Sequence, residues 1–155
     1  IGDEVFVGDN PTGTLALANL ERGGNLRLLA TGTGIAPYIS LLRDPELFNS
    51  FDNVNIVWTT RLIAEQTCFK EFIASTASNF YCSTTRESSE LEGRVQLLIE
   101  KKMILKDASP KTDKIMICGS IDFNNEMKMY FNNKGWQEGS TKIAGTFVQE
   151  RAFVS

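Results

Sequence analysis

Hydrophobic residues along this chain are concentrated in short runs. These runs are separated by clusters of turn-forming residues or by segments of helical periodicity. Five such runs stand out: Leu26–Ala30, Val54–Thr59, Phe80–Thr84, Lys114–Cys118 and Thr146–Val148. A short, nearly continuous apolar run is typical of a strand that is buried on both faces. We therefore predict five strands in a sheet with helices on both sides.

The segments between these strands favour helices. Residues 64–77 carry apolar side chains at positions 64, 68, 69, 72, 73 and 77, close to a period of 3.6. The predicted helices are Ala36–Leu42, Ala64–Ala77, Arg94–Lys102 and Asn124–Asn133. Strands that alternate with helices indicate a parallel sheet with right-handed crossovers. The predicted fold class is therefore α/β, with a five-stranded parallel sheet flanked by helices.

The first 25 residues have a different pattern. Val5–Val7 alternates with polar neighbours and ends at a turn cluster, and Leu15–Leu20 is a short apolar segment that ends at Arg22. The chain starts at Ile1 rather than Met, directly on a predicted strand. We therefore expect that earlier residues are missing and that the chain is a fragment.

Composition and charge exclude several classes of function. The 155 residues are 42% hydrophobic and 23% charged, as in one globular domain. The net charge of -3 and the lack of a long apolar run predict neither nucleic acid nor membrane as a partner. Three widely spaced cysteines form neither a zinc motif nor a disulfide framework, which favours a reducing, cytoplasmic location.

The sequence contains no histidine. Its absence removes the usual Ser-His-Asp and Cys-His nucleophile arrangements and histidine-based metal sites. We predict no metal site, so the chemistry must come from carboxylates, a thiol or a cofactor.

The ends of four predicted strands carry small polar residues, glycine or arginine. They carry threonine, serine, glycine or arginine, in Thr31–Gly34, Thr59–Arg61, Thr84–Glu87 and Cys118–Ser120. In parallel α/β sheets, ligands bind beyond the carboxyl ends of the strands, where the strand order reverses. The agreement among these four ends predicts a single ligand site there.

Each motif also has a plainer interpretation. Glycines in Thr31–Gly34, before a predicted helix, suit close approach of a phosphate, but the spacing is not G-x-G-x-x-G and an ordinary tight turn fits equally. Arg61, Arg86 and Arg94 suit a phosphate monoester such as the 2′-phosphate of a dinucleotide, or are solvated surface residues. Cys118 has no adjacent His or Lys, which favours packing or positioning over nucleophilic catalysis.

Taken together, the motifs resemble the ferredoxin–NADP reductase family, specifically its bacterial type. The matching segments occur in family order: Pro11–Leu15, Thr31–Pro37, Thr60-Arg61, Thr85–Glu87, Gly93-Arg94, Met116–Ser120 and Glu150–Val154. The resemblance implies a flavoprotein that transfers hydride between NADPH and FAD and passes electrons singly to ferredoxin or flavodoxin. It also implies that residues 26–155 are the NADP-binding domain and residues 1–25 the end of an incomplete FAD-binding β-barrel.

The resemblance assigns roles to individual residues. Cofactor-binding roles fall on Thr31, Gly32, Thr33, Gly34, Pro37, Thr60, Arg61, Thr85, Arg86, Arg94, Gly119, Ser120, Ile121, Asp122 and Glu126. Among them the arginines and their threonine neighbours would hold the 2′-phosphate side. Cys118 would lie near the nicotinamide, and Ala152 and Phe153 would pack on the flavin, which itself carries the redox chemistry.

Two departures from the family bear on function. Trp58-Thr59-Thr60 is bulkier than the family's usual stretch before the arginine, and the Arg-x-Tyr-Ser/Thr stretch and Gly-rich loop of the flavin domain are absent. We therefore expect a partial reductase that binds FAD poorly or not at all. The alternatives are an inactive NADP(H)-binding module, a flavin or oxygenase reductase component with another acceptor, and an unrelated α/β domain.

Overall fold

The computed structural model describes residues 2, 4, 6 and 13–151, the last of these for its backbone only. The predicted strand Val5–Val7, the Pro11-Thr12 part of the first motif, and Ala152 and Phe153 lie outside the described residues.

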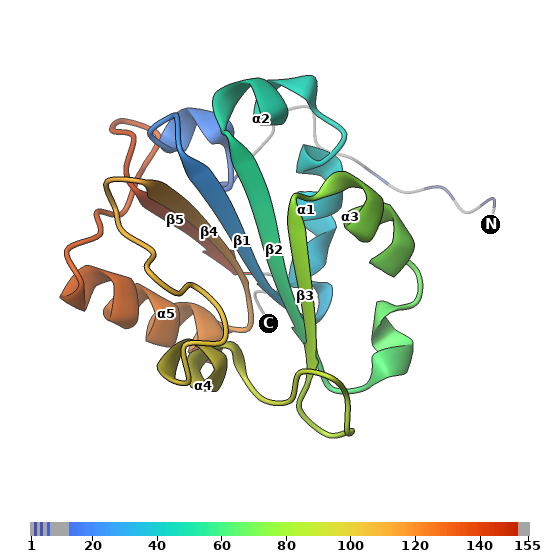
Figure 1. Ribbon diagram of the computed structural model, residues 1–155. Helices are drawn as coiled ribbons and strands as arrows, with labels where there is room; N and C mark the ends of the chain where they lie inside the picture. Colours follow the sequence, from blue (N-terminus) through green and yellow to red (C-terminus); the bar gives the residue numbers. More distant parts are fainter. Residues whose placement is uncertain (1, 3, 5, 7–12, 152–155) are drawn as a thin grey trace.

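A sheet of five parallel strands forms the centre of the molecule (Figure 1). Its strands are β1 (Asn25–Thr31), β2 (Asn53–Thr60), β3 (Asn79–Thr84), β4 (Asp113–Gly119) and β5 (Phe147–Arg151), in the spatial order β3-β2-β1-β4-β5. The predicted fold class is confirmed. β5 continues three residues past the predicted end at Val148 and pairs with β4 as far as Cys118 and Gly119. The sequence did not indicate this extension, because Gln149 and Glu150 are polar and end the apolar run.

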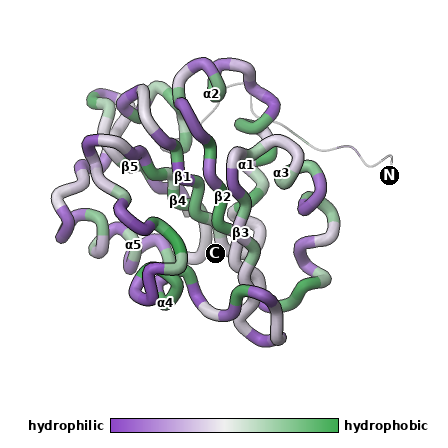
Figure 2. The backbone as a smooth tube through the Cα atoms, in the orientation of Figure 1, coloured by the Kyte–Doolittle hydropathy of each residue, from purple (hydrophilic) through white to green (hydrophobic). Residues whose placement is uncertain are grey.

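Helices cover both faces of this sheet, and alternate residues of the strands face opposite sides. Leu28 of β1 belongs to the core cluster beneath α1 (Ala36–Leu41), α2 (Pro45–Ser50) and α3 (Lys70–Thr76). Leu29, the next residue, belongs to the second cluster beneath α4 (Val95–Glu100) and α5 (Ile121–Asn133). Figure 2 shows hydrophobic stretches in the central strands and hydrophilic residues in the surrounding loops. No helix in the described part of the chain is both long and apolar enough to span a membrane.

The helices differ from the prediction at three places. The first helix ends close to its predicted end, but the Asp44 side chain then accepts a hydrogen bond from the Glu46 N–H at 2.9 Å and so caps the unpredicted α2. α5 begins three residues early, at Ile121, because the Ser120 hydroxyl accepts from the Phe123 N–H. The predicted helix 64–77 is a 3-10 turn (η3, Ile63–Gln66) followed by the shorter α3.

The reversal of strand order lies between β1 and β4, and two glycines allow the close approach there. The chain leaves β1 toward β2 on one side and later returns to pair β4 on the other. A Cβ on Gly34 would lie 2.1 Å from the Cys118 carbonyl oxygen, and one on Gly119 would lie 2.1 Å from the Thr31 hydroxyl oxygen. The ends of β1 and β4 are thus brought together at the edge where a ligand site was predicted.

Candidate functional site

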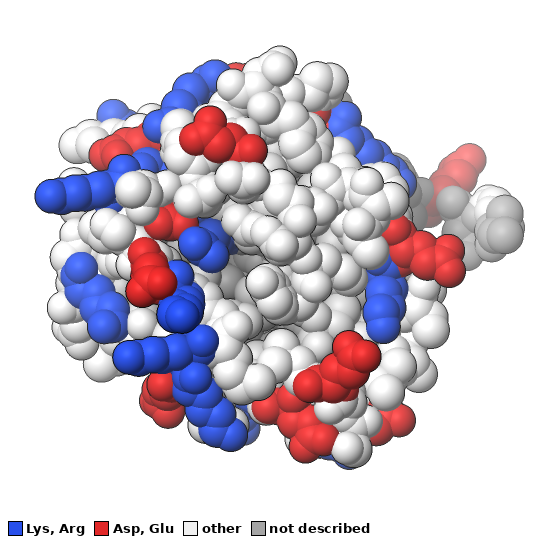
Figure 3. Space-filling model, viewed as in Figure 1, with Lys and Arg blue, Asp and Glu red and all other residues white. Residues whose placement is uncertain are grey.

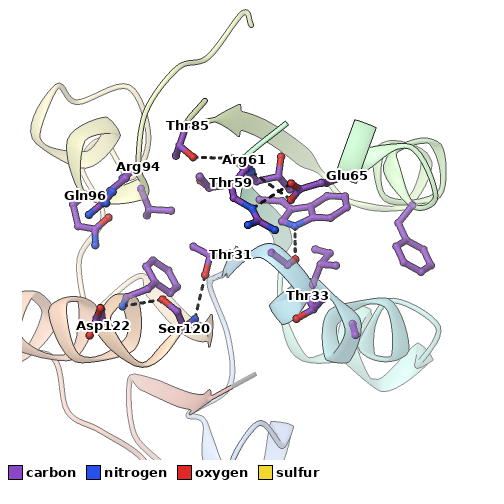
Figure 4. Close-up of a pocket in the computed structure, with 18 of the residues that line it drawn as sticks. Thr31, Thr33, Thr59, Arg61, Glu65, Thr85, Arg94, Gln96, Ser120 and Asp122 are labelled. Carbon is purple, nitrogen blue, oxygen red and sulfur yellow. Dashed lines mark hydrogen bonds and ion pairs between the residues drawn. The ribbon is translucent and has the colours of Figure 1, made fainter. Parts of the chain in front are cut away.

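A cavity of about 870 Å³ opens at the carboxyl ends of the strands (Figure 4). Its walls come from the ends of β1, β2 and β4, from η3, and from the starts of α4 and α5. The lining residues are Thr31, Gly32, Thr33, Ile35, Ala36, Trp58, Thr59, Thr60, Arg61, Glu65, Cys68, Phe69, Thr85, Arg94, Val95, Gln96, Ser120, Asp122, Phe123 and Glu126. Apolar walls with a few polar groups are typical of a small-molecule site.

The turn after β1 is held by both neighbouring strands. Gly32 has a positive φ of 52° and starts the 3-10 turn Gly32–Ile35 that leads into α1. The indole N–H of Trp58, on β2, donates to the Gly32 carbonyl oxygen at 2.8 Å. On the other side, the Thr31 hydroxyl accepts from the Ser120 N–H after β4 at 3.3 Å. The turn is therefore fixed before any ligand arrives.

A buried hydrogen-bond network positions the end of β2. The Thr60 hydroxyl accepts from the Gln66 side-chain amide at 2.8 Å and donates to the Leu62 carbonyl oxygen at 2.9 Å. Thr59 and Ser83 share a hydrogen bond of 2.6 Å between their hydroxyls. Arg61 follows directly, and its side chain remains 63% exposed in the cavity. Its Nε lies 3.4 Å from an oxygen of Glu65.

The charge around the cavity is mixed. Arg61 and Arg94 line it together with Glu65, Asp122 and Glu126. In Figure 3, basic side chains gather over α4 and the loop that follows it, and acidic ones gather over the loop between β3 and α4. The cavity therefore offers cationic groups that can bind phosphate, beside carboxylates that can accept hydrogen bonds from hydroxyl groups.

The structure brings most of the predicted site residues together in this cavity. These are Thr31, Gly32, Thr33, Thr60, Arg61, Thr85, Arg94, Ser120, Asp122 and Glu126. Arg86 lines a shallower neighbouring hollow that shares Thr85 with the cavity. Gly34, Pro37, Cys118, Gly119 and Ile121 do not line the cavity.

Cys118 lies in the core, 2% exposed, directly opposite Glu150 in the β4–β5 pair. Burial raises the pKa of its thiol to about 12, and the nearby Glu150 carboxylate contributes to the rise. A thiol in this state is protonated at neutral pH and is not an activated nucleophile.

Sequence reasoning missed the apolar walls of the cavity. Trp58 reads as one more buried strand residue, and Phe69 as part of a helix core. In the structure Trp58 and Phe69 both line the cavity. The position of Trp58 just before a polar strand end was the available signal.

Glu150, in β5, connects the last strand to Thr14 and Leu15. Its carboxylate accepts hydrogen bonds from the backbone N–H groups of Thr14, at 2.8 Å, and Leu15, at 3.2 Å. Residues 13–15 are therefore held against the end of β5, close to the cavity edge of the sheet. Among the residues that the structure describes, no group of His, Cys, Asp and Glu side chains is arranged to hold a metal ion.

Comparison with known proteins gives consistent results. Residues 28–129 match the family described as oxidoreductase NAD-binding domain. The chain is 32% identical to ferredoxin–NADP reductase A of Sorangium cellulosum, over 99% of this chain and 61% of that protein. It is also 32% identical to the flavodoxin/ferredoxin–NADP reductase of Rhodobacter capsulatus, over 99% of this chain and 63% of that protein. The chain thus spans less than two thirds of these relatives.

Solved structures show the same fold. A ferredoxin NADP+ reductase from Neisseria gonorrhoeae with bound FAD and NADP superposes with a TM-score of 0.83 at 27% identity, over 93% of this chain and 62% of that one. The C-terminal domain of a hydrogenase from Pyrococcus furiosus, at 13% identity, shares the fold alone, with a TM-score of 0.59 over 93% of this chain and 100% of that one.

Proposed function

This chain belongs to the ferredoxin/flavodoxin–NADP reductase family as its oxidoreductase NAD-binding domain, and from that premise we propose that its cavity binds NADP(H). The observation that carries the proposal is the convergence of three strand ends and two arginines on one cavity at the reversal of strand order. Ligands of open parallel sheets bind at this place.

Each part of the cavity suits a part of the nucleotide. We assign the nicotinamide end to the turn 31–34, whose last residue, Gly34, packs against the backbone of Cys118. Arg61 and Arg94, with Thr60 and Thr85, suit the 2′-phosphate, and Arg86 would reach it from the adjoining hollow. The segment after β4 would line the rest of the site with Ser120, Asp122 and Glu126.

In the whole protein, we propose that NADPH delivers hydride to FAD and that electrons then pass singly to ferredoxin or flavodoxin. The relatives from Sorangium cellulosum and Rhodobacter capsulatus, a ferredoxin–NADP reductase and a flavodoxin/ferredoxin–NADP reductase, support this reaction and these acceptors. FAD supplies the redox chemistry when it is bound. This chain orients the nucleotide and, through Ala152 and Phe153, would pack on the flavin. Three free cysteines, Cys68, Cys82 and Cys118, support a reducing compartment, the cytoplasm.

Nucleotide titrations of arginine variants test the assignment. Arg94→Ala is expected to weaken NADP+ binding by about tenfold or more and NAD+ binding little, because a charge-assisted phosphate contact contributes roughly 1.5–3 kcal/mol. Arg86→Ala is expected to act in the same direction. Isothermal titration calorimetry of the 155-residue chain measures both affinities.

Arg22→Ala is the matched control, because Arg22 pairs with Glu46, precedes the amino end of β1 and does not line the cavity. Equal losses for both nucleotides would contradict the assignment of the arginines to the 2′-phosphate. Failure of the unaltered chain to bind NADP+ or 2′,5′-ADP would contradict the proposed function itself.

A second candidate is a nucleotide-binding module that is inactive by itself, favoured by the 61–63% coverage of the relatives. Absorbance separates the two candidates. A yellow protein whose flavin band bleaches with NADPH is a reductase, whereas a colourless protein that retains 2′,5′-ADP is the isolated module.

A further inference from the structure

A carboxylate shares the cavity with the arginine that we assign to the 2′-phosphate. Glu65 lines the cavity, and one of its oxygens lies 3.4 Å from Nε of Arg61 (Figure 4). Its other oxygen accepts a long hydrogen bond, 3.4 Å, from the Arg61 backbone N–H. The side chain of Glu65 is half as exposed as that of Arg61, at 32% against 63%.

The position of Glu65 does not depend on its pairing with Arg61. Glu65 lies in the turn η3, and the next residue, Gln66, is 2% exposed and anchored to Thr60 and to the Ser83 carbonyl oxygen. The start of the same turn is held where the Glu87 carboxylate accepts from the Ile63 N–H at 2.7 Å. The turn is thus fixed at two points, and Glu65 stays at the cavity whether or not Arg61 turns toward a ligand.

The two side chains favour different nucleotides. A phosphate dianion that binds Arg61 must approach the Glu65 carboxylate, and like charges at this range repel each other. A ribose hydroxyl, in contrast, can donate a hydrogen bond to that carboxylate, and an acidic residue holds the ribose 2′-hydroxyl in many NAD-binding sites. The same corner of the cavity can therefore accept either group.

We propose that Glu65 is a specificity-determining residue that lets the cavity take NAD(H) as well as NADP(H) and limits the preference for the phosphorylated nucleotide. The inference rests on the proposed function. It predicts that Arg61 raises discrimination and Glu65 lowers it.

The experiment compares Glu65→Gln with the unaltered chain in titrations with NADP+ and NAD+. Glu65→Gln is expected to tighten NADP+ binding about threefold to tenfold, because the repulsion is removed. It is expected to weaken NAD+ binding by roughly threefold, because an amide accepts a hydroxyl hydrogen bond less strongly than a carboxylate. The ratio of the two dissociation constants therefore rises about tenfold or more.

Glu71→Gln is the matched control, because Glu71 is an exposed carboxylate in the first turn of α3 outside the cavity. It removes the same charge and is expected to leave the ratio unchanged. Glu65→Ala is a second variant that shifts the ratio in the same direction as Glu65→Gln. Thermal unfolding of each variant reports whether the fold is retained.

Two outcomes overturn the inference. An unchanged ratio in a folded Glu65→Gln or Glu65→Ala chain that still binds nucleotide, whether neither affinity changes or both change equally, overturns it and leaves the proposed function intact. If the unaltered chain binds neither nucleotide, the proposed function fails and the inference fails with it.

Discussion

Two glycines in the turn after β1 are required for different reasons. Gly34 is in close contact with backbone, since a Cβ there would lie 2.1 Å from the Cys118 carbonyl oxygen. Gly32 has open space around the place of its Cβ but a positive φ of 52°. At Gly34 the close packing between β1 and β4 leaves no room for a side chain, whereas at Gly32 the backbone conformation itself disfavours one.

These reasons predict unequal costs of substitution. Gly34→Ala is expected to lower the free energy of unfolding by about 3 kcal/mol, because backbone atoms must move to admit the methyl group. Gly32→Ala is expected to cost about 1 kcal/mol, the penalty for a left-handed alanine. Urea denaturation of both variants measures the difference. A Gly34→Ala chain that is as stable as Gly32→Ala would contradict the close approach.

Side-chain interactions connect the strands β1 and β4 at both of their ends. At the end opposite the cavity, Asp113 of β4 accepts a hydrogen bond from the Arg27 guanidinium of β1 at 2.7 Å and others from the Thr112 hydroxyl and the Ser109 N–H. Burial acts to raise the pKa of Asp113, but these hydrogen bonds and the charge of Arg27 together hold it below its ordinary value.

Asp113→Asn tests this connection. It is expected to lower the free energy of unfolding at pH 7 by about 1.5–3 kcal/mol, because charge-assisted hydrogen bonds are lost. A lowered pKa gives stability that is present above the unfolded-state pKa and is lost as the pH falls through the folded-state value. The difference from the unaltered chain should therefore shrink between pH 7 and pH 3 in urea titrations. Weaker NADP+ binding by the variant would contradict the separation of this connection from the cavity.

Strands were more predictable than helices and cavity walls. The apolar runs located all five strands, because central strands of a parallel sheet are buried on both faces. The helix α2 was missed because its six residues, Pro45–Ser50, are too few to show a helical repeat of apolar positions. The strand-end polar residues of the cavity followed from local chemistry. Phe69 did not, because its place follows the turn η3, and the buried side chain of Gln66 that fixes this turn has no periodic signal. The role of Trp58 did not either, because its indole bonds to Gly32 of the neighbouring strand end, a contact that only the sheet brings about.

Across the molecule, the three thiols differ in how far they are exposed to solvent. Cys118 is buried and Cys82 half-buried, and burial raises their pKa values to about 12 and about 11, whereas Cys68 is exposed at the cavity. A raised thiol pKa contributes stability that is present below the unfolded-state value and is lost as the pH rises through the folded-state value. The folded chain is therefore expected to lose stability above about pH 9.

Thiol labelling checks this order at pH 8. Cys68 is expected to react rapidly in the native chain, and Cys82 and Cys118 only after unfolding in urea. Saturating NADP+ is expected to slow the labelling of Cys68, since that residue lines the cavity. Fast native labelling of Cys118 would show that the contact between β1 and β4 opens readily.

The reversal of strand order between β1 and β4 also has a consequence during synthesis of the chain. Asn25 and Asp113, which meet across this pair, are 88 positions apart. At a synthesis rate of roughly 5–20 residues per second, β1 waits roughly 4–18 s for its second neighbour. During that interval one edge of β1 is open to pairing with other nascent chains. The connection that creates the ligand site thus leaves β1 exposed to aggregation until β4 has been synthesised, and the pairing that completes the site also closes this edge.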